Sequence, residues 1–165
     1  MSKIIEVDFL PRETNQDFPL DFPWLNSLSD SAFGSKRRIL IVDNDPNTTH
    51  LVKILLEKTG RYQVFEENES SRAHQSAKSF QPDLILLDIV MPETHADGAE
   101  IATRIEADPE LQSAPIIFLT GLVTSAESKT DLRIDGRPCL AKPINVEELI
   151  EAIDKNLLAR ARAFG

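Results

Sequence analysis

Four polar side chains stand directly after short apolar runs of the sequence, at the places where buried strands would end: Asp43, Asp88, Thr120 and Lys142. Carboxylate oxygens are ligands that Mg²⁺ prefers, and hydroxyl and ammonium groups donate hydrogen bonds to phosphoryl oxygens. A carboxylate can also act as the nucleophile that accepts a phosphoryl group. These residue types therefore predict a small site for a divalent cation and a phosphoryl group.

Short apolar runs bounded by polar residues are typical of strands that are buried on both faces of a parallel sheet. We expect such strands over residues 38–43, 62–66, 83–88, 115–120 and 138–141. Strands that alternate with helices predict an α/β fold, here a five-stranded parallel sheet with helices on both faces. Ligands of such sheets bind beyond the carboxyl ends of the strands, so the polar side chains are expected to meet at one edge.

The segments between the predicted strands carry helical patterns. We expect helices over residues 46–59, 70–79 and 125–132, and helices that begin near Gly98 and Asn145. Asp45 is the expected N-cap of the first helix. The apolar face of that helix is predicted to be the one shared by Leu51, Ile54, Leu55 and Lys58.

The ordered set of strand-end residues, with Lys142-Pro143 last, resembles the receiver domain of bacterial two-component response regulators. The resemblance covers roughly residues 36–158. It implies a flavodoxin-like fold with strand order 2-1-3-4-5 and a site beside the first strand. It also implies that Asp88 is the phosphoryl acceptor, that Thr120 and Lys142 contact the phosphoryl oxygens, and that the domain is a regulator rather than a turnover enzyme.

The cation implied by the resemblance is Mg²⁺, held by Asp43, Asn44, Asp88 and the backbone carbonyl of Val90. Asn44 stands where the family's coordinating carboxylate usually stands, and its amide oxygen carries no charge. We therefore expect phosphorylation to require more Mg²⁺ than in a receiver with two adjacent acids. Asp45 either assists the cation through water or caps the following helix, and capping is the preferred interpretation.

Further positions receive a role from the same resemblance. Gly121 leaves room for the phosphodonor, and the peptide bond before Pro143 is expected to be cis and to aim the preceding lysine at the site. Cys139 stands in place of the aromatic residue that couples the strand-4 hydroxyl to the output surface, so this coupling is replaced or lost. Val90 and Leu122 cannot orient water, which predicts slow loss of the phosphoryl group.

The composition excludes several classes of protein. A formal net charge of −9 argues against direct binding of nucleic acid, which requires basic patches. Cys139 is the only cysteine, so no internal disulfide forms and a reducing, cytoplasmic compartment is expected. No apolar stretch is long enough to cross a membrane, and we expect no membrane partner.

The chain is expected to have three parts. Residues 1–35 form an acidic, proline-containing arm whose aromatic residues, Trp24 among them, are expected to dock on the domain or on a partner. Residues 36–160 form the receiver domain, and residues 161–165 form a C-terminal tail. A stand-alone receiver would take its phosphoryl group from a sensor histidine kinase or a phosphotransfer protein. It would signal by contact with a downstream protein, and a homodimer is compatible with the sequence.

Two other functions remain open from the sequence. A pseudo-receiver, which keeps the fold as a binding module without phosphorylation, is favoured by Asn44 and Cys139. A phosphohydrolase of the haloacid dehalogenase type would use Asp43 as nucleophile and Asp45 as general acid–base. That family needs a further acidic pair on a strand after the lysine, which this sequence lacks, and it leaves Asp88 without a role.

Overall fold

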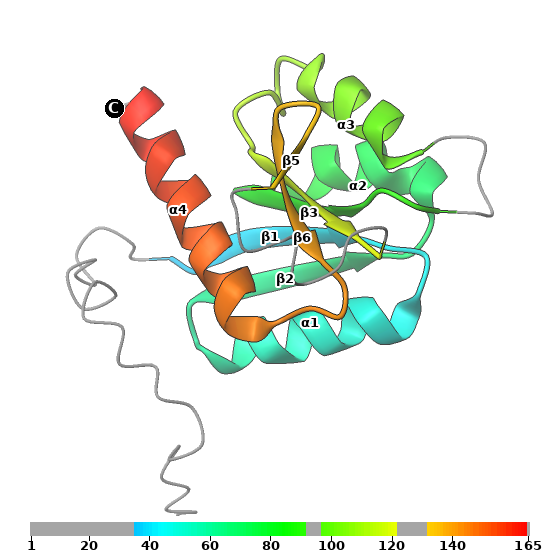
Figure 1. Cartoon of the computed structure of the whole chain (residues 1–165). Coiled ribbons are helices and arrows are strands. Elements are labelled where there is room, and N and C mark those ends of the chain that lie inside the picture. The colour runs from blue at the N-terminus through cyan, green and yellow to red at the C-terminus, as the bar shows by residue number, and fades with distance from the viewer. Residues whose placement is uncertain (1–34, 92–96, 122–131, 165) are drawn as a thin grey trace, which may run out of the picture. The chain divides into compact units, whose positions relative to one another are not determined.

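The computed structural model describes residues 35–91, 97–121 and 132–164, and the arm predicted over residues 1–35 lies almost wholly outside them. Within the described residues, one six-stranded sheet has the order β2-β1-β3-β4-β6-β5 (Figure 1). Its strands are β1 (Arg37–Val42), β2 (Tyr62–Glu67), β3 (Leu84–Asp88), β4 (Ile116–Thr120), β5 (Arg133–Ile134) and β6 (Arg137–Ala141). The helices are α1 (Pro46–Lys58), the short 3₁₀ helix η2 (Ser70–Arg72), α2 (Ala73–Phe80), α3 (Gly98–Glu106) and α4 (Val146–Phe164).

The predicted α/β class and strand order are confirmed, with β6 as the predicted fifth strand. The pairs β1–β2, β1–β3, β3–β4 and β4–β6 are all parallel. The expectation of a purely five-stranded parallel sheet was wrong, because β5 adds a short antiparallel strand at the edge of β6. Asp135 and Gly136 join the two strands with φ of 50° and 79°, the left-handed conformation that a two-residue hairpin turn requires.

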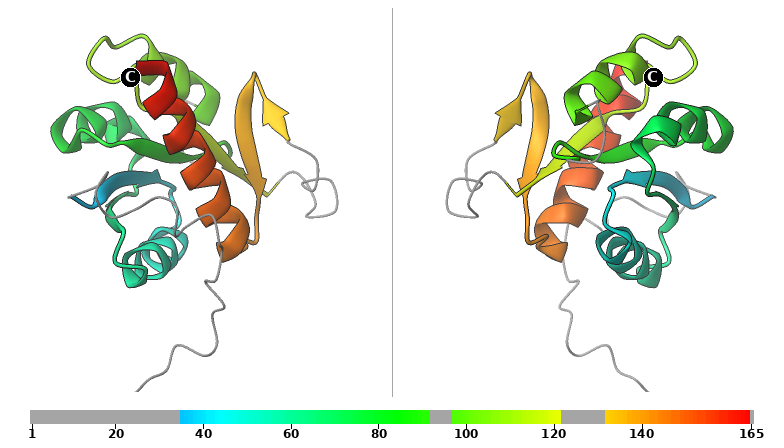
Figure 2. Two further views of the ribbon diagram at one scale, coloured as in Figure 1. Left: turned by 90° about the vertical axis from the view of Figure 1, so that its left-hand side faces the viewer. Right: turned by 90° about the vertical axis from the view of Figure 1, so that its right-hand side faces the viewer.

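Helices cover both faces of the sheet (Figure 2). Alternate residues of a strand point to opposite faces, so the apolar residues of β1 pack in two cores, one on each face of the sheet. Ile39 and Ile41 pack with residues of α1 and α4, whereas Leu40 and Val42 pack with residues of α2 and α3. The buried strands explain the continuous apolar runs of the sequence.

Helix α1 begins as predicted but buries a different face. The Asp45 side chain accepts a hydrogen bond from the Asn47 amide and so caps the helix. Val52 and Leu56 are buried, whereas Leu51 and Ile54 are 56% and 50% exposed. The predicted apolar face was therefore wrong.

The flank of α1 that carries Lys53 and Glu57 makes polar contacts with β2. Glu57 Oε1 accepts a hydrogen bond of 2.9 Å from the Val64 amide, and Lys53 Nζ lies 3.4 Å from Glu66 Oε2. They accompany the orientation in which Val52 and Leu56 are buried in the core. A period of apolar residues in one helix carries no information on such contacts.

Two further predicted segments differ from the structure. Helix α4 continues to Phe164, so residues 161–164, expected as part of a tail, are helical. The helix predicted over residues 125–132 lies outside the described residues except for Leu132, which is not helical. In the described part of the chain, no helix is both long and apolar enough to cross a lipid bilayer.

Candidate functional site

The strand-end side chains meet at one edge of the sheet, as the sequence predicted. Lys142 follows β6, and its Nζ lies 2.5 Å from Asp43 Oδ2, after β1, and 3.2 Å from Asp88 Oδ2, at the end of β3. The backbone amide of Lys142 donates a hydrogen bond of 2.7 Å to the Thr120 carbonyl at the end of β4. Parallel strands bring these residues together because their carboxyl ends share one edge.

Both carboxylates are almost fully buried and are oriented by backbone amides. Asp43 is 1% exposed and accepts a hydrogen bond of 2.9 Å from the Asp45 amide through Oδ1. Asp88 is 4% exposed and accepts one of 3.1 Å from the Val90 amide. One oxygen of each carboxylate is thus held by the backbone, and the other faces Lys142.

The electrostatics of the site follow from two acids that share one base. Burial raises the pKa of Asp88 above its ordinary value, the charge of Asp43 raises it further, and Lys142 acts in the opposite direction. Burial alone would lower the pKa of Lys142, but its hydrogen bonds and charge interactions with Asp43 and Asp88 outweigh burial and raise it. A second cation is therefore favoured at this edge of the sheet.

The donor set fits a small divalent cation. Mg²⁺ is usually bound by one or two carboxylates together with water and phosphate oxygens. Among the described residues, no group of three or more acidic, histidine or cysteine side chains gathers as a metal site. The two carboxylates that face Lys142 at this edge of the sheet are those of Asp43 and Asp88. Half-buried Asn44 follows Asp43 directly and offers a neutral oxygen.

The Asp45 carboxylate is engaged elsewhere. Its Oδ1 accepts a hydrogen bond of 3.0 Å from the Asn47 amide, and its Oδ2 accepts one of 2.8 Å from the Thr48 hydroxyl. These contacts lower the pKa of Asp45, with the Thr48 hydrogen bond as the largest cause. The structure thus supports the preferred interpretation, in which Asp45 caps α1.

Helix α3 begins directly against the acceptor strand. The Gly98 amide donates a hydrogen bond of 3.0 Å to the Ile89 carbonyl. A Cβ atom at Gly98 would lie 2.3 Å from the Asp88 carbonyl oxygen and 2.8 Å from Ile89 Cα. Only glycine fits at this position, a requirement that sequence reasoning missed although it placed the helix start there.

The other predicted site residues differ in how far they are buried. Thr120 is fully buried, whereas Gly121 is exposed and a Cβ there would meet nothing within 4 Å. Val90 is 41% exposed. The Lys142–Pro143 bond is cis, as the resemblance implies. Leu122 lies outside the described residues.

Cys139 lies on β6 opposite Phe118 of β4. Its side chain is buried, and burial raises the pKa of the thiol to about 11. The Phe118 ring faces the Arg137 guanidinium, whose Cζ lies 5.6 Å from the ring centroid. Cys139 thus packs as a small apolar residue in the core and offers no aromatic ring to swing toward Thr120.

The end of β2 supplies two residues that the sequence reasoning missed. Glu67 is buried, with its carboxylate in hydrogen bonds to the Glu69 amide and the Ser76 hydroxyl. Asn68 Nδ2 donates a hydrogen bond of 2.8 Å to the Asp43 carbonyl. The signal was present, because polar residues follow β2 as they follow the other strands.

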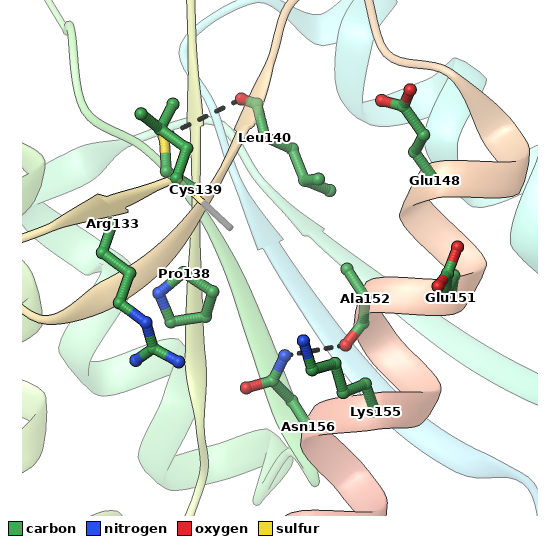
Figure 3. A pocket seen from close by; sticks show the side chains of 10 residues that line it. Arg133, Pro138, Cys139, Leu140, Glu148, Glu151, Ala152, Lys155 and Asn156 are labelled. Carbon is green, nitrogen blue, oxygen red and sulfur yellow. Dashed lines mark hydrogen bonds between the residues drawn. The ribbon is translucent and has the colours of Figure 1, made fainter. Parts of the chain in front are cut away.

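A separate cavity of about 510 Å³ lies between the β5–β6 hairpin and α4 (Figure 3). Pro138, Cys139 and Leu140 form its strand side, and Ala152 and Asn156 belong to its helix side. None of the four strand-end residues lines it.

Comparison with known proteins identifies the family. Residues 39–154 match the family described as the response regulator receiver domain. Response regulator Rre1 of Synechocystis sp. is 34% identical over 76% of this chain and 53% of its own length, so the chain spans about half of that relative. Response regulator receiver protein CpdR of Brucella abortus is 34% identical over 74% of this chain and 98% of its own.

Solved structures show the same fold. The response regulator receiver domain protein (CheY-like) from Methanospirillum hungatei superposes with a TM-score of 0.65 at 26% identity, over 78% of this chain and 99% of that one. The family match covers most of the sheet and all four strand-end residues. The chain belongs to the response regulator receiver domain family.

Proposed function

We propose that this receiver accepts a phosphoryl group on Asp88 from a phosphohistidine of a sensor histidine kinase or phosphotransfer protein. The observation that carries the proposal is the position of Lys142, whose ammonium lies within 3.2 Å of Asp88 and 2.5 Å of Asp43. Two buried carboxylates and one ammonium at the carboxyl edge of the sheet support a role of Asp88 as the nucleophile.

In the proposed reaction, an Asp88 carboxylate oxygen attacks the phosphorus of the donor. A P–O bond forms, the P–N bond to the donor imidazole breaks, and the electron pair of that bond leaves with the imidazole. Lys142 would then pair with a phosphoryl oxygen, and the Thr120 hydroxyl would donate a hydrogen bond to another. Mg²⁺, held by Asp43, Asn44, Asp88 and the Val90 carbonyl, would supply charge neutralisation between nucleophile and phosphate.

The lifetime of the phosphorylated form is proposed to be long. The Val90 side chain, two residues after Asp88, is apolar and 41% exposed. Such a side chain carries no polar group that could orient water for attack on the phosphoryl group. A half-life of minutes or longer after removal of the donor supports this expectation, and a half-life of seconds contradicts it.

The output is proposed to be protein–protein contact through β6 and α4. The cavity between the β5–β6 hairpin and α4 makes this surface concave, and its lining combines apolar residues with the charged side chains of Arg133, Glu148, Glu151 and Lys155 (Figure 3). The match spans 98% of CpdR but only 53% of Rre1, so the matched region is nearly the whole of the first relative and about half of the second.

Of the alternatives, the pseudo-receiver is favoured by Asn44 and Cys139, since one charge and one aromatic are missing. Against it stands the intact set of Asp88, Thr120 and Lys142 at one sheet edge. The phosphohydrolase alternative is not supported, because both Asp45 oxygens are bound in the cap of α1.

The test is the intact mass of the full chain after incubation with acetyl phosphate and Mg²⁺. The wild type should gain the mass of one phosphoryl group, and Asp88→Ala should gain none. Asp45→Asn is the matched control, because asparagine keeps the helix cap and the mass gain should persist. No gain in the wild type at high Mg²⁺ would make the chain a pseudo-receiver.

A further inference from the structure

We propose that Asn68 is a positioning residue of the cation site, which holds the Asp43–Asn44 peptide against α1 so that both side chains present their oxygens to Mg²⁺. This inference rests on the proposed Mg²⁺-dependent function. Asn68 itself would not touch the cation or the phosphoryl group.

Both protons of the Asn68 amide nitrogen are used in the contact. Nδ2 donates a hydrogen bond of 2.8 Å to the Asp43 carbonyl and one of 3.0 Å to Thr49 Oγ1. Thr49 is fully buried in α1 and donates its own proton to the Pro46 carbonyl at 3.1 Å. Asn68 therefore bridges the end of β1 to the first turn of α1.

The backbone of Asp43 is held by β2 at both of its polar groups. Its amide donates a hydrogen bond of 3.2 Å to the Glu67 carbonyl, and its carbonyl accepts from Asn68. The Glu67 carboxylate binds the Glu69 amide and the Ser76 hydroxyl, which anchors the loop that carries Asn68. The loop that carries Asn68 is thus held in place by the buried, hydrogen-bonded carboxylate of Glu67.

The Asp43 carbonyl lies in the plane of the Asp43–Asn44 peptide. Fixing this oxygen restricts rotation of that peptide, and with it the direction in which the Asn44 side chain leaves the backbone. The Asp43 side chain is held in turn by the Asp45 amide and by Lys142. Without Asn68, the peptide between the two cation ligands would lose its side-chain hydrogen bond.

Orientation matters more here than in a site with two adjacent acids. A carboxylate attracts a cation from many directions through its charge, whereas the neutral amide of Asn44 contributes only when its oxygen points at the cation. Groups that orient metal ligands typically change metal affinity by about 10- to 100-fold when they are removed. Because the Asn44 oxygen is neutral, Mg²⁺ binding by this chain should depend on an orienting group such as Asn68.

The experiment compares the Mg²⁺ dissociation constant of four full-length proteins by calorimetry: wild type, Asn68→Ala, Thr49→Val and the double variant. Asn156→Ala is the matched control, because Asn156 Nδ2 also donates a hydrogen bond of 2.8 Å to a backbone carbonyl, that of Ala152 in α4. The phosphorylation rate with acetyl phosphate at saturating Mg²⁺ is the second measurement.

We expect the dissociation constant of Asn68→Ala to rise about tenfold, with the rate at saturating Mg²⁺ within about twofold of wild type and Asn156→Ala unchanged. A merely structural role would lower the active fraction and the rate instead. Thr49→Val should weaken binding by a smaller factor, and should add nothing in the Asn68→Ala background because the bridge is already broken. If Asn68→Ala does not fold, the Mg²⁺ dissociation constant of Thr49→Val tests the role of Asn68: an increase supports it and an unchanged value overturns it.

An unchanged dissociation constant in both single variants overturns the role of Asn68 while the proposed function stands. A wild type that binds no Mg²⁺ overturns the proposed function, and the inference with it. The two failures are therefore distinguished by the wild-type titration alone.

Discussion

The Lys142 ammonium lies closer to Asp43 than to Asp88, at 2.5 Å against 3.2 Å. The lysine that is proposed to bind the phosphoryl group therefore pairs with both carboxylates that are proposed to hold Mg²⁺. A Mg²⁺ ion held by the same two carboxylates would weaken their attraction for the ammonium. Binding of the cation would release Lys142 toward the phosphoryl group on Asp88.

Lys142→Met should destabilise the metal-free protein by about 1–3 kcal/mol, because two buried carboxylates lose their partner. Added Mg²⁺ should raise the melting temperature of Lys142→Met more than that of the wild type. The control is Lys53→Met, which removes a surface ion pair with Glu66 and should cost no more than about 1 kcal/mol. Equal stabilisation of both proteins by Mg²⁺ would contradict the competition between lysine and cation.

The titration of Asp88 predicts a pH dependence of stability in the metal-free protein. Its pKa is raised above 3.8, mainly by burial, so the folded state keeps the proton to a higher pH than the unfolded chain. As the pH rises from 3.8 through the raised pKa, stability should fall, because only the unfolded chain ionises freely. Denaturant unfolding of both proteins across this window isolates the contribution of Asp88: as the pH rises, the stability of the wild type should fall relative to that of Asp88→Asn.

Asn44→Asp should restore the second acid of the cation site. Adding a charge next to Asp43 should raise the affinity for Mg²⁺ roughly tenfold and lower the stability of the metal-free protein. Asn47→Asp makes the same charge change at an exposed position of α1 and should alter the Mg²⁺ affinity far less. Calorimetric titration of the three proteins checks the prediction, and equal affinity of wild type and Asn44→Asp would show that Asn44 costs the site nothing.

Sequence reasoning predicted the site better than its surroundings. Asp43, Asp88, Thr120 and Lys142 could be placed together because strand ends are marked by a change from apolar to polar residues, and parallel strands end at one edge. The preference of Lys142 for Asp43 could not be predicted, since it depends on side-chain geometry. The close contact of Gly98 with Asp88 likewise depends on how α3 returns to the sheet.

The β5–β6 hairpin is a different case, because its signal was in the sequence. Asp135-Gly136 between Ile134 and Arg137 is the typical two-residue hairpin turn. The prediction instead passed from a helix over residues 125–132 directly to a strand at Pro138. The expectation of an all-parallel sheet outweighed a local turn signal.

Two leucines of α1 test the burial that the structure assigns. Leu56→Ala should destabilise the protein by about 2–5 kcal/mol, since Leu56 is fully buried in the core. Leu51→Ala should change stability by no more than about 0.5 kcal/mol, because the Leu51 side chain is 56% exposed. Urea unfolding of both variants measures the difference, and the reverse order of the two effects would restore the face predicted from the sequence.

Two glycines beside the site should respond differently to a methyl group. Gly98→Ala forces a Cβ against the backbone of Asp88 and Ile89, so it should destabilise the protein by about 1–3 kcal/mol and slow phosphorylation by acetyl phosphate. Gly121→Ala meets no atom within 4 Å and should leave stability unchanged. Its methyl group is instead expected to hinder the approach of a protein phosphodonor more than that of acetyl phosphate, because a protein surface must fit closely around the site. Comparing melting temperatures and the two phosphorylation rates separates the effects, and a stable, fully active Gly98→Ala would show that α3 can move away from Asp88 without cost.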